Sequence, residues 1–295
     1  MKITKTSTGV LFVTFLIGHA SVPPLATKQI VPEQIPGHVS TVSTAIEKPF
    51  YVDGELETVE ENDNRDYGGN YPFKIKLLET GEGFHGDEVP AKDGETWLGL
   101  FNENGRHFLR PTKVKIRRVY DPLVDDEEKR PKRKTGKNVE VSDKANPVFL
   151  LKNSEKLRAG EIATLFRGVT FEEIIEYSDE MTSLKKGFFH EYEIGGKKYT
   201  LRVKEAKTKE GERVLALILE GEGKRQILHT TNVNEYSEEL GALFWVGDLD
   251  RDGKPDFYME LYVHDNVNYK NLFFSAPAAK DKLVKKVAYF WTTGC

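Results

Sequence analysis

Short runs of aromatic and β-branched residues, separated by tight-turn signals, constrain the fold of this chain more than any other feature. The segment 191–203 is the clearest case, because Gly195-Gly196 separates two such runs. Two consecutive glycines supply the positive φ angles that a two-residue hairpin turn requires. Asn104-Gly105 gives the same signal farther upstream. The pattern predicts a mainly β protein built from antiparallel hairpins.

Changes in composition divide the chain behind its N-terminus into four segments. Residues 21–70 are rich in polar residues and proline, which predicts a flexible leader. The ordered runs fall into a small β module over 71–121 and a β-rich domain over 147–295, each antiparallel and barrel- or sandwich-like. Between them, 122–146 joins an acidic block to a basic run at 129–137. This segment indicates a solvated linker, with a polyanion-binding patch as the alternative.

The N-terminus is typical of a secretory signal peptide over residues 1–20. Lys2 and Lys5 precede an apolar stretch, 9–17, that is too short to span a bilayer, and small residues follow it. A buried strand or short helix is the alternative. The signal peptide predicts a secreted or periplasmic protein. Cys295 is the single cysteine, so an internal disulfide is excluded.

The most specific chemical signal is an acidic loop that contains one glycine. In such a loop the side chains at positions one, three and five turn inward, and position six needs the backbone conformation that suits glycine. Gly253 occupies that position. Ca²⁺ takes about six to eight oxygen ligands, so carboxylates at this spacing predict a structural calcium site. The predicted ligands are the carboxylates of Asp248, Asp250, Asp252 and Asp256 and the backbone carbonyl of Lys254.

The residues around this loop favour strands over the helices of an EF-hand. Position twelve, where an EF-hand carries a bidentate glutamate, is Met259, and the flanking runs 242–246 and 257–263 are aromatic and β-branched. A strand–DxDxDGxxD–strand segment resembles the calcium loops of FG-GAP/VCBS-type repeats, as in integrin-like propeller blades, and more distantly those of dockerins. The resemblance covers about residues 243–263 in one copy, which disfavours a whole propeller. A solvated acidic turn is the alternative interpretation.

The net charge of the chain and the absence of several known motifs argue against several functional classes. The formal net charge of −4 disfavours nucleic acid as a partner. No stretch after the signal peptide is long enough for a transmembrane helix, so we expect no membrane span in the mature chain. The sequence lacks HExxH, GxSxG and P-loop motifs, and it has no GxGxxG motif tied to a strand–helix unit. His190-Glu191 and His264-Asp265 are adjacent residues that would face opposite sides of a strand, which argues against acid–base pairs.

Two functions of different classes are compatible with these observations. The first is a non-enzymatic binding or structural module that Ca²⁺ stabilises, with a protein or polysaccharide as its ligand. The alternative is an extracellular or periplasmic hydrolase that acts on a polymer and carries a structural Ca²⁺. Exposed aromatic residues near Trp97 or Trp291 would favour the binding module. A cleft with two convergent carboxylates would favour the enzyme.

Overall fold

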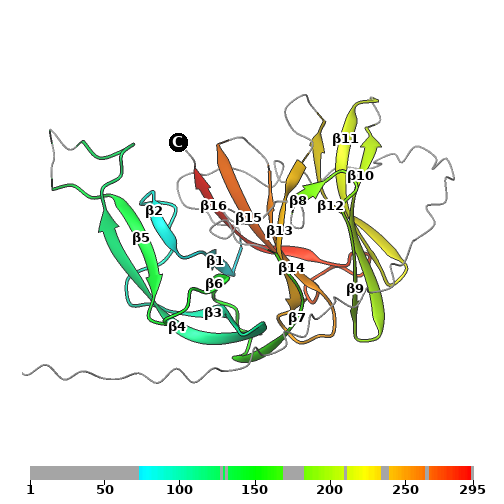
Figure 1. Ribbon diagram of the computed structural model, residues 1–295, viewed down its shortest axis with the longest axis horizontal. Coiled ribbons are helices and arrows are strands. Elements are labelled where there is room, and N and C mark those ends of the chain that lie inside the picture. The colour runs from blue at the N-terminus through cyan, green and yellow to red at the C-terminus, as the bar shows by residue number, and fades with distance from the viewer. Residues whose placement is uncertain are drawn as a thin grey trace, which may run out of the picture. The chain divides into compact units, whose positions relative to one another are not determined.

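The computed structural model describes residues 73–126, 129, 132–168, 183–208, 211–233, 239–262 and 266–293, which belong to one compact unit. These residues form strands and connecting turns, which confirms the predicted mainly β fold (Figure 1). No helix among them could cross a membrane. The predicted signal peptide and leader, His264-Asp265 and Cys295 lie outside the described residues. The strands are β1 (Lys76–Leu78), β2 (Gly81–Phe84), β3 (Thr96–Glu103), β4 (Arg106–Val119), β5 (Gly136–Val141), β6 (Phe149–Lys152), β7 (Gly160–Arg167), β8 (Ser183–Lys185), β9 (Phe189–Ile194), β10 (Lys197–Lys207), β11 (Arg213–Gly221), β12 (Lys224–Asn232), β13 (Glu239–Asp248), β14 (Asp256–Leu261), β15 (Val267–Phe274) and β16 (Lys285–Thr293).

Twelve of these strands form one antiparallel sheet. Its main path runs β1-β6-β3-β4-β7-β13-β14-β15-β16, while β2, β5 and β8 pair beside this path. The two ends of the path, β1 and β16, lie close together. Rings also meet edge-on there, Phe73 with Tyr289 at 5.7 Å between centroids and Phe84 with Phe290 at 5.6 Å. The sheet therefore curls into a nearly closed, barrel-like form.

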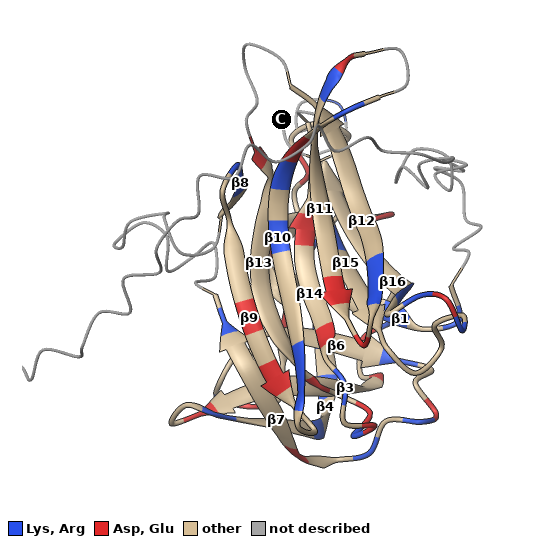
Figure 2. Ribbon diagram, turned by 90° about the vertical axis from the view of Figure 1, so that its right-hand side faces the viewer, with Lys and Arg blue, Asp and Glu red and all other residues tan. Residues whose placement is uncertain are grey.

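The remaining four strands form a second antiparallel sheet in the order β12-β11-β10-β9, which lies beside β13 and β14 (Figure 1). Gly195 and Gly196 connect β9 to β10 with φ angles of 58° and 69°, so the predicted two-glycine hairpin is confirmed. Charged residues of both signs are distributed along the strands of this sheet (Figure 2). Cross-strand ion pairs such as Lys198–Glu191, at 3.0 Å, join neighbouring strands there.

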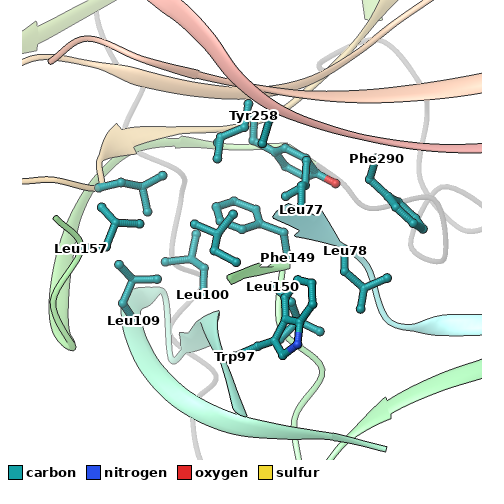
Figure 3. Packing of buried hydrophobic residues seen from close by; sticks show 14 of the residues in the cluster. Leu77, Leu78, Trp97, Leu100, Leu109, Phe149, Leu150, Leu157, Tyr258 and Phe290 are labelled. Atoms are coloured by element: carbon teal, nitrogen blue, oxygen red, sulfur yellow. The ribbon is translucent and has the colours of Figure 1, made fainter. Parts of the chain in front are cut away.

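The strands β13 and β14 and the C-terminal half of β15 are largely buried on both faces, because they separate two hydrophobic cores. One core fills the barrel-like sheet, where Tyr258 of β14 packs on Phe149 at 4.8 Å between ring centroids (Figure 3). The other lies between the two sheets, where Phe257 and Met259 of β14 meet residues such as Leu217 of β11. Successive residues of β14 thus enter different cores, and every residue of this strand is buried. Such a strand provides a rigid base for the loop that precedes it.

Two parts of the barrel-like sheet contain residues that are unusual in strands or linkers. The strand β4 continues through Pro111. This proline, which lacks an N–H, falls between the part of β4 that pairs with β7 and the part that pairs with β5, where one edge of β4 has no partner among the described strands. Residues 136–141, expected within a linker, form β5 because Val139 and Val141 are buried against β4. The pairing of β4 with β7 also joins residues 71–121 and 147–295 in one sheet.

Candidate metal centre

The acidic loop connects two neighbouring strands in the middle of the barrel-like sheet. Asp248 is the last residue of β13 and Asp256 is the first of β14. The two strands pair antiparallel up to the loop, with Gly247 opposite Asp256. The predicted strand–loop–strand arrangement is thus confirmed. Because the ladder holds both strand ends, the two outer aspartates of the loop are held side by side.

Backbone hydrogen bonds curl the loop around the Asp248 side chain. Its Oδ1 accepts the N–H of Asp252 and its Oδ2 accepts the N–H of Gly253, both at 2.9 Å. Gly253 has a φ of 79°, in the left-handed region that glycine adopts without strain. The conformation expected of this glycine is therefore confirmed.

Three of the predicted ligands converge. Asp248, Asp250 and Asp256 each offer a carboxylate oxygen, and these three oxygens lie within 4.8 Å of one another. Among the described residues this is the group of acidic, histidine or cysteine side chains that could hold a metal ion. Asp256 is fully buried, and its oxygens accept the N–H groups of Leu249 and Ser275 at 2.8 and 2.9 Å. The Oδ1 of Asp250 is also buried and has no hydrogen-bond partner within the described part of the chain.

The electrostatics of this group favour a bound cation. Burial raises the pKa of Asp250 to about 6, and the negative charges of Asp252 and Asp248 add to the effect. The pKa of Asp256 is raised well above its usual value by burial and then by the charge of Asp250. Burial likewise raises the pKa of Asp248. A cation between these carboxylates would remove their mutual repulsion and stabilise their charged forms.

Asp252 and Lys254, the other predicted ligands, lie outside the group of three. The Asp252 carboxylate accepts the hydroxyl of Ser275 at 3.0 and 3.1 Å and the N–H of Lys254 at 2.9 Å. Ligand roles for Asp252 and for the Lys254 carbonyl stay predictions. The sequence analysis missed Ser275, which joins Asp252 to Asp256 because it also donates its N–H to Asp256. This serine follows β15, and no local sequence signal connects it to the loop.

Two residues between the aspartates anchor the loop to the rest of the fold. Leu249 is fully buried in the core of the barrel-like sheet. Arg251 has a φ of 61° and turns its guanidinium to the backbone carbonyls of Arg158, at 3.2 Å, and Glu161, also at 3.2 Å. The loop is therefore held from the inside by packing and from the outside by hydrogen bonds to the segment that enters β7.

Three other residues that the sequence analysis named, His190, Glu191 and Trp97, make packing or ion-pair contacts within the fold. His190 stacks on Tyr192 at 4.8 Å between ring centroids, while Glu191 pairs with Lys198, so the two neighbours face opposite sides of β9 as expected. Trp97 is 2% exposed and belongs to the core of the barrel-like sheet. It therefore contributes no aromatic binding surface.

In comparisons with known proteins, no family model, no curated protein and no solved structure matches this chain.

Proposed function

We propose that this is an exported, Ca²⁺-binding β-rich protein that serves as a binding or structural module, with the ion in the loop between β13 and β14. The observation that carries the proposal is the convergence of one carboxylate oxygen each from Asp248, Asp250 and Asp256, together with the buried, unpartnered Oδ1 of Asp250. Oxygen-only donor sets suit hard cations, and Ca²⁺ accepts an irregular coordination geometry more readily than Mg²⁺ does.

Several features support calcium and a structural role for it. The order of aspartates and glycine follows that of FG-GAP/VCBS-type calcium loops, which the chain resembles over about residues 243–263. The three carboxylates belong to a loop that closes two central strands, so an ion there would link β13 to β14. The features of a signal peptide at residues 1–20 support export to a compartment rich in free Ca²⁺.

The alternative is a hydrolase that acts on an extracellular polymer. An acid–base pair would require, besides the buried Asp248 and Asp256, a second carboxylate close to Asp250 in the open cavity. Glu155 lines the same cavity as Asp250. However, it pairs with Lys74 at 2.9 Å, and its side chain is 77% exposed. The geometry therefore supports a bound ion better than it supports hydrolysis.

Thermal unfolding of the purified chain in EDTA and in Ca²⁺ tests the proposal. Ca²⁺ at about one hundred times its dissociation constant should stabilise the fold by about 2.7 kcal/mol. The double substitution Asp250→Ala with Asp252→Ala should abolish this stabilisation, because it removes one converging carboxylate and the Ser275 partner. Asp281→Ala, on an exposed residue outside the loop, is the matched control and should retain it. An equal melting temperature of the unsubstituted chain with and without Ca²⁺ would remove the assignment.

A further inference from the structure

A cavity of about 360 Å³ lies beside the converging carboxylates, and Asp250 forms part of its lining. Its walls come from the residues before β1, the turn after β6, the end of β15 and the start of β16. The volume is in the lower part of the range of small-molecule sites, about 300–1,000 Å³. The cavity therefore suits a small ligand.

Most of the cavity wall is apolar. Phe73, Ile75, Leu157, Phe274 and Val287 line it, and Leu157 and Phe274 also belong to the core of the barrel-like sheet. An apolar wall of this kind favours the hydrocarbon part of a ligand over a sugar, whose hydroxyl groups would lose their hydrogen bonds to water.

Positive charge surrounds the apolar wall. Lys156 and Lys285 line the cavity and are exposed, and neither forms an ion pair with another described residue. Lys285 is placed directly opposite Phe274 in the pairing of β16 with β15. Ammonium groups at the rim of an apolar cavity favour a ligand with an anionic end.

The position of Asp250 in the cavity lining indicates where that anionic end binds. Its own negative charge would repel an anion, but a Ca²⁺ ion held by the three carboxylates would offset two of their three negative charges and present a positive centre to a ligand oxygen. Three carboxylates leave part of the coordination shell of Ca²⁺, about six to eight oxygens, for other donors. Asp250 lines the cavity whereas Asp256 is fully buried, so a ligand in the cavity would approach a bound ion from the side of Asp250.

We propose that this cavity binds a small amphipathic carboxylate whose oxygens bind the Ca²⁺ ion beside Asp250 and whose hydrocarbon part packs on Phe73, Leu157 and Val287. This inference rests on the proposed calcium site and names the ligand class that the site accepts. Lys156 and Lys285 supply long-range attraction to the carboxylate, while the ion fixes its position.

Calorimetric titration with sodium octanoate tests the inference. Octanoate should bind the Ca²⁺-loaded chain about tenfold or more tightly than the chain in EDTA, because the carboxylate loses its metal ligand there. Octan-1-ol has the same hydrocarbon length without the carboxylate, and it should bind weakly whether Ca²⁺ is present or not. Equal octanoate affinity in Ca²⁺ and in EDTA would overturn the metal-bound pose.

A pair of matched variants separates the cavity from the metal loop. Ala276→Trp places a large side chain at an exposed position of the cavity lining and should abolish octanoate binding while Ca²⁺ binding is retained. Ala279→Trp, three residues farther and outside the lining, should bind both. Octanoate binding that survives in Ala276→Trp overturns the inference.

The same titrations distinguish failure of this inference from failure of the proposed function. Ca²⁺ is first titrated into the chain without octanoate. Ca²⁺ binding without octanoate binding overturns the cavity ligand alone, whereas absence of Ca²⁺ binding overturns the proposed function on which it rests.

Discussion

At Asp250, cation binding and the stability of the cation-free chain make opposite demands on one side chain. Its carboxylate must be charged to bind a metal, yet it lies near Asp248 and Asp256 with a buried, unpartnered oxygen. Burial raises its pKa to about 6. A carboxyl group whose pKa is raised in the folded state contributes stability below its unfolded pKa, and that contribution is lost as the pH rises through the folded pKa. Near pH 7.5 the carboxylate of Asp250 is charged in the cation-free chain, so this stabilising contribution is lost in full.

Asp250→Asn should consequently stabilise the chain in EDTA near pH 7.5 by about 1–2 kcal/mol, because it removes a buried charge while keeping the side-chain shape. The same substitution should remove most of the stabilisation by Ca²⁺. Chemical denaturation of both chains in EDTA and in Ca²⁺ measures the two effects, with Asp281→Asn as the control. A lower stability of Asp250→Asn in EDTA would contradict this explanation.

The residues of the loop differ in how far sequence alone could identify them. Asp248, Asp250 and Asp256 lie within nine residues, so their spacing predicted their convergence. Ser275 and the carbonyl groups that Arg251 contacts reach the loop from distant elements, at separations of about 20 and 90 residues. Such partners depend on strand order, which a local pattern does not encode.

At the scale of single elements, local chemistry predicted the hairpins well. The turns at Asn104-Gly105 and Gly195-Gly196 have positive φ angles at both residues, as two-residue hairpins require. The strand β5 was missed because its neighbourhood is dominated by charged residues, and only Val139 and Val141 mark its buried face. Turn residues act locally, whereas a strand at the side of a sheet forms because a partner is available to it.

His229 of β12 is a buried histidine that connects the second sheet to the end of β14. Its Nε2 lies 3.0 Å from the carbonyl oxygen of Tyr262, so this nitrogen donates the hydrogen bond. Its Nδ1 is buried and has no hydrogen-bond partner among the described residues. Burial lowers the pKa of His229 to about 4. The folded chain therefore keeps this ring neutral at pH values where the unfolded chain protonates it.

This histidine predicts a loss of stability in weak acid. A folded pKa below the unfolded value of about 6.5 contributes full stability above pH 6.5, and this contribution declines as the pH falls toward 4. Between pH 7.5 and 5.5 the loss from His229 should be about 1 kcal/mol. His229→Gln retains an N–H donor for Tyr262 without titrating, so its free energy of unfolding should fall less over this range. Equal pH dependence in both chains would contradict the assignment.

At the scale of the whole molecule, β13, β14 and β15 belong to both hydrophobic cores at once. Leu100 lies in the core of the barrel-like sheet and Leu217 in the core between the sheets, and both are fully buried. The division into separate domains at 122–146 stays a prediction from the sequence. Strands that pack on both sides should couple the two cores in unfolding.

Leu100→Ala and Leu217→Ala test this coupling. Each should lower the free energy of unfolding by about 2–5 kcal/mol, because each removes buried methyl groups and leaves a cavity. If the cores unfold together, either substitution shifts a single calorimetric transition to lower temperature. Two transitions, of which Leu100→Ala shifts only one, would instead support independent modules.

The three aspartates lie at different depths, which would determine the route of an ion that binds them. Asp256 is fully buried and hydrogen-bonded to Ser275 at the end of β15, while Asp250 lines the cavity beside β1 and β16. An ion bound by the three carboxylates would be reached from solvent through that cavity on the side of Asp250. A ligand bound in the cavity would block this access and slow extraction of the ion by a chelator. The rate of ion release, as well as the affinity for the ion, would then depend on that ligand.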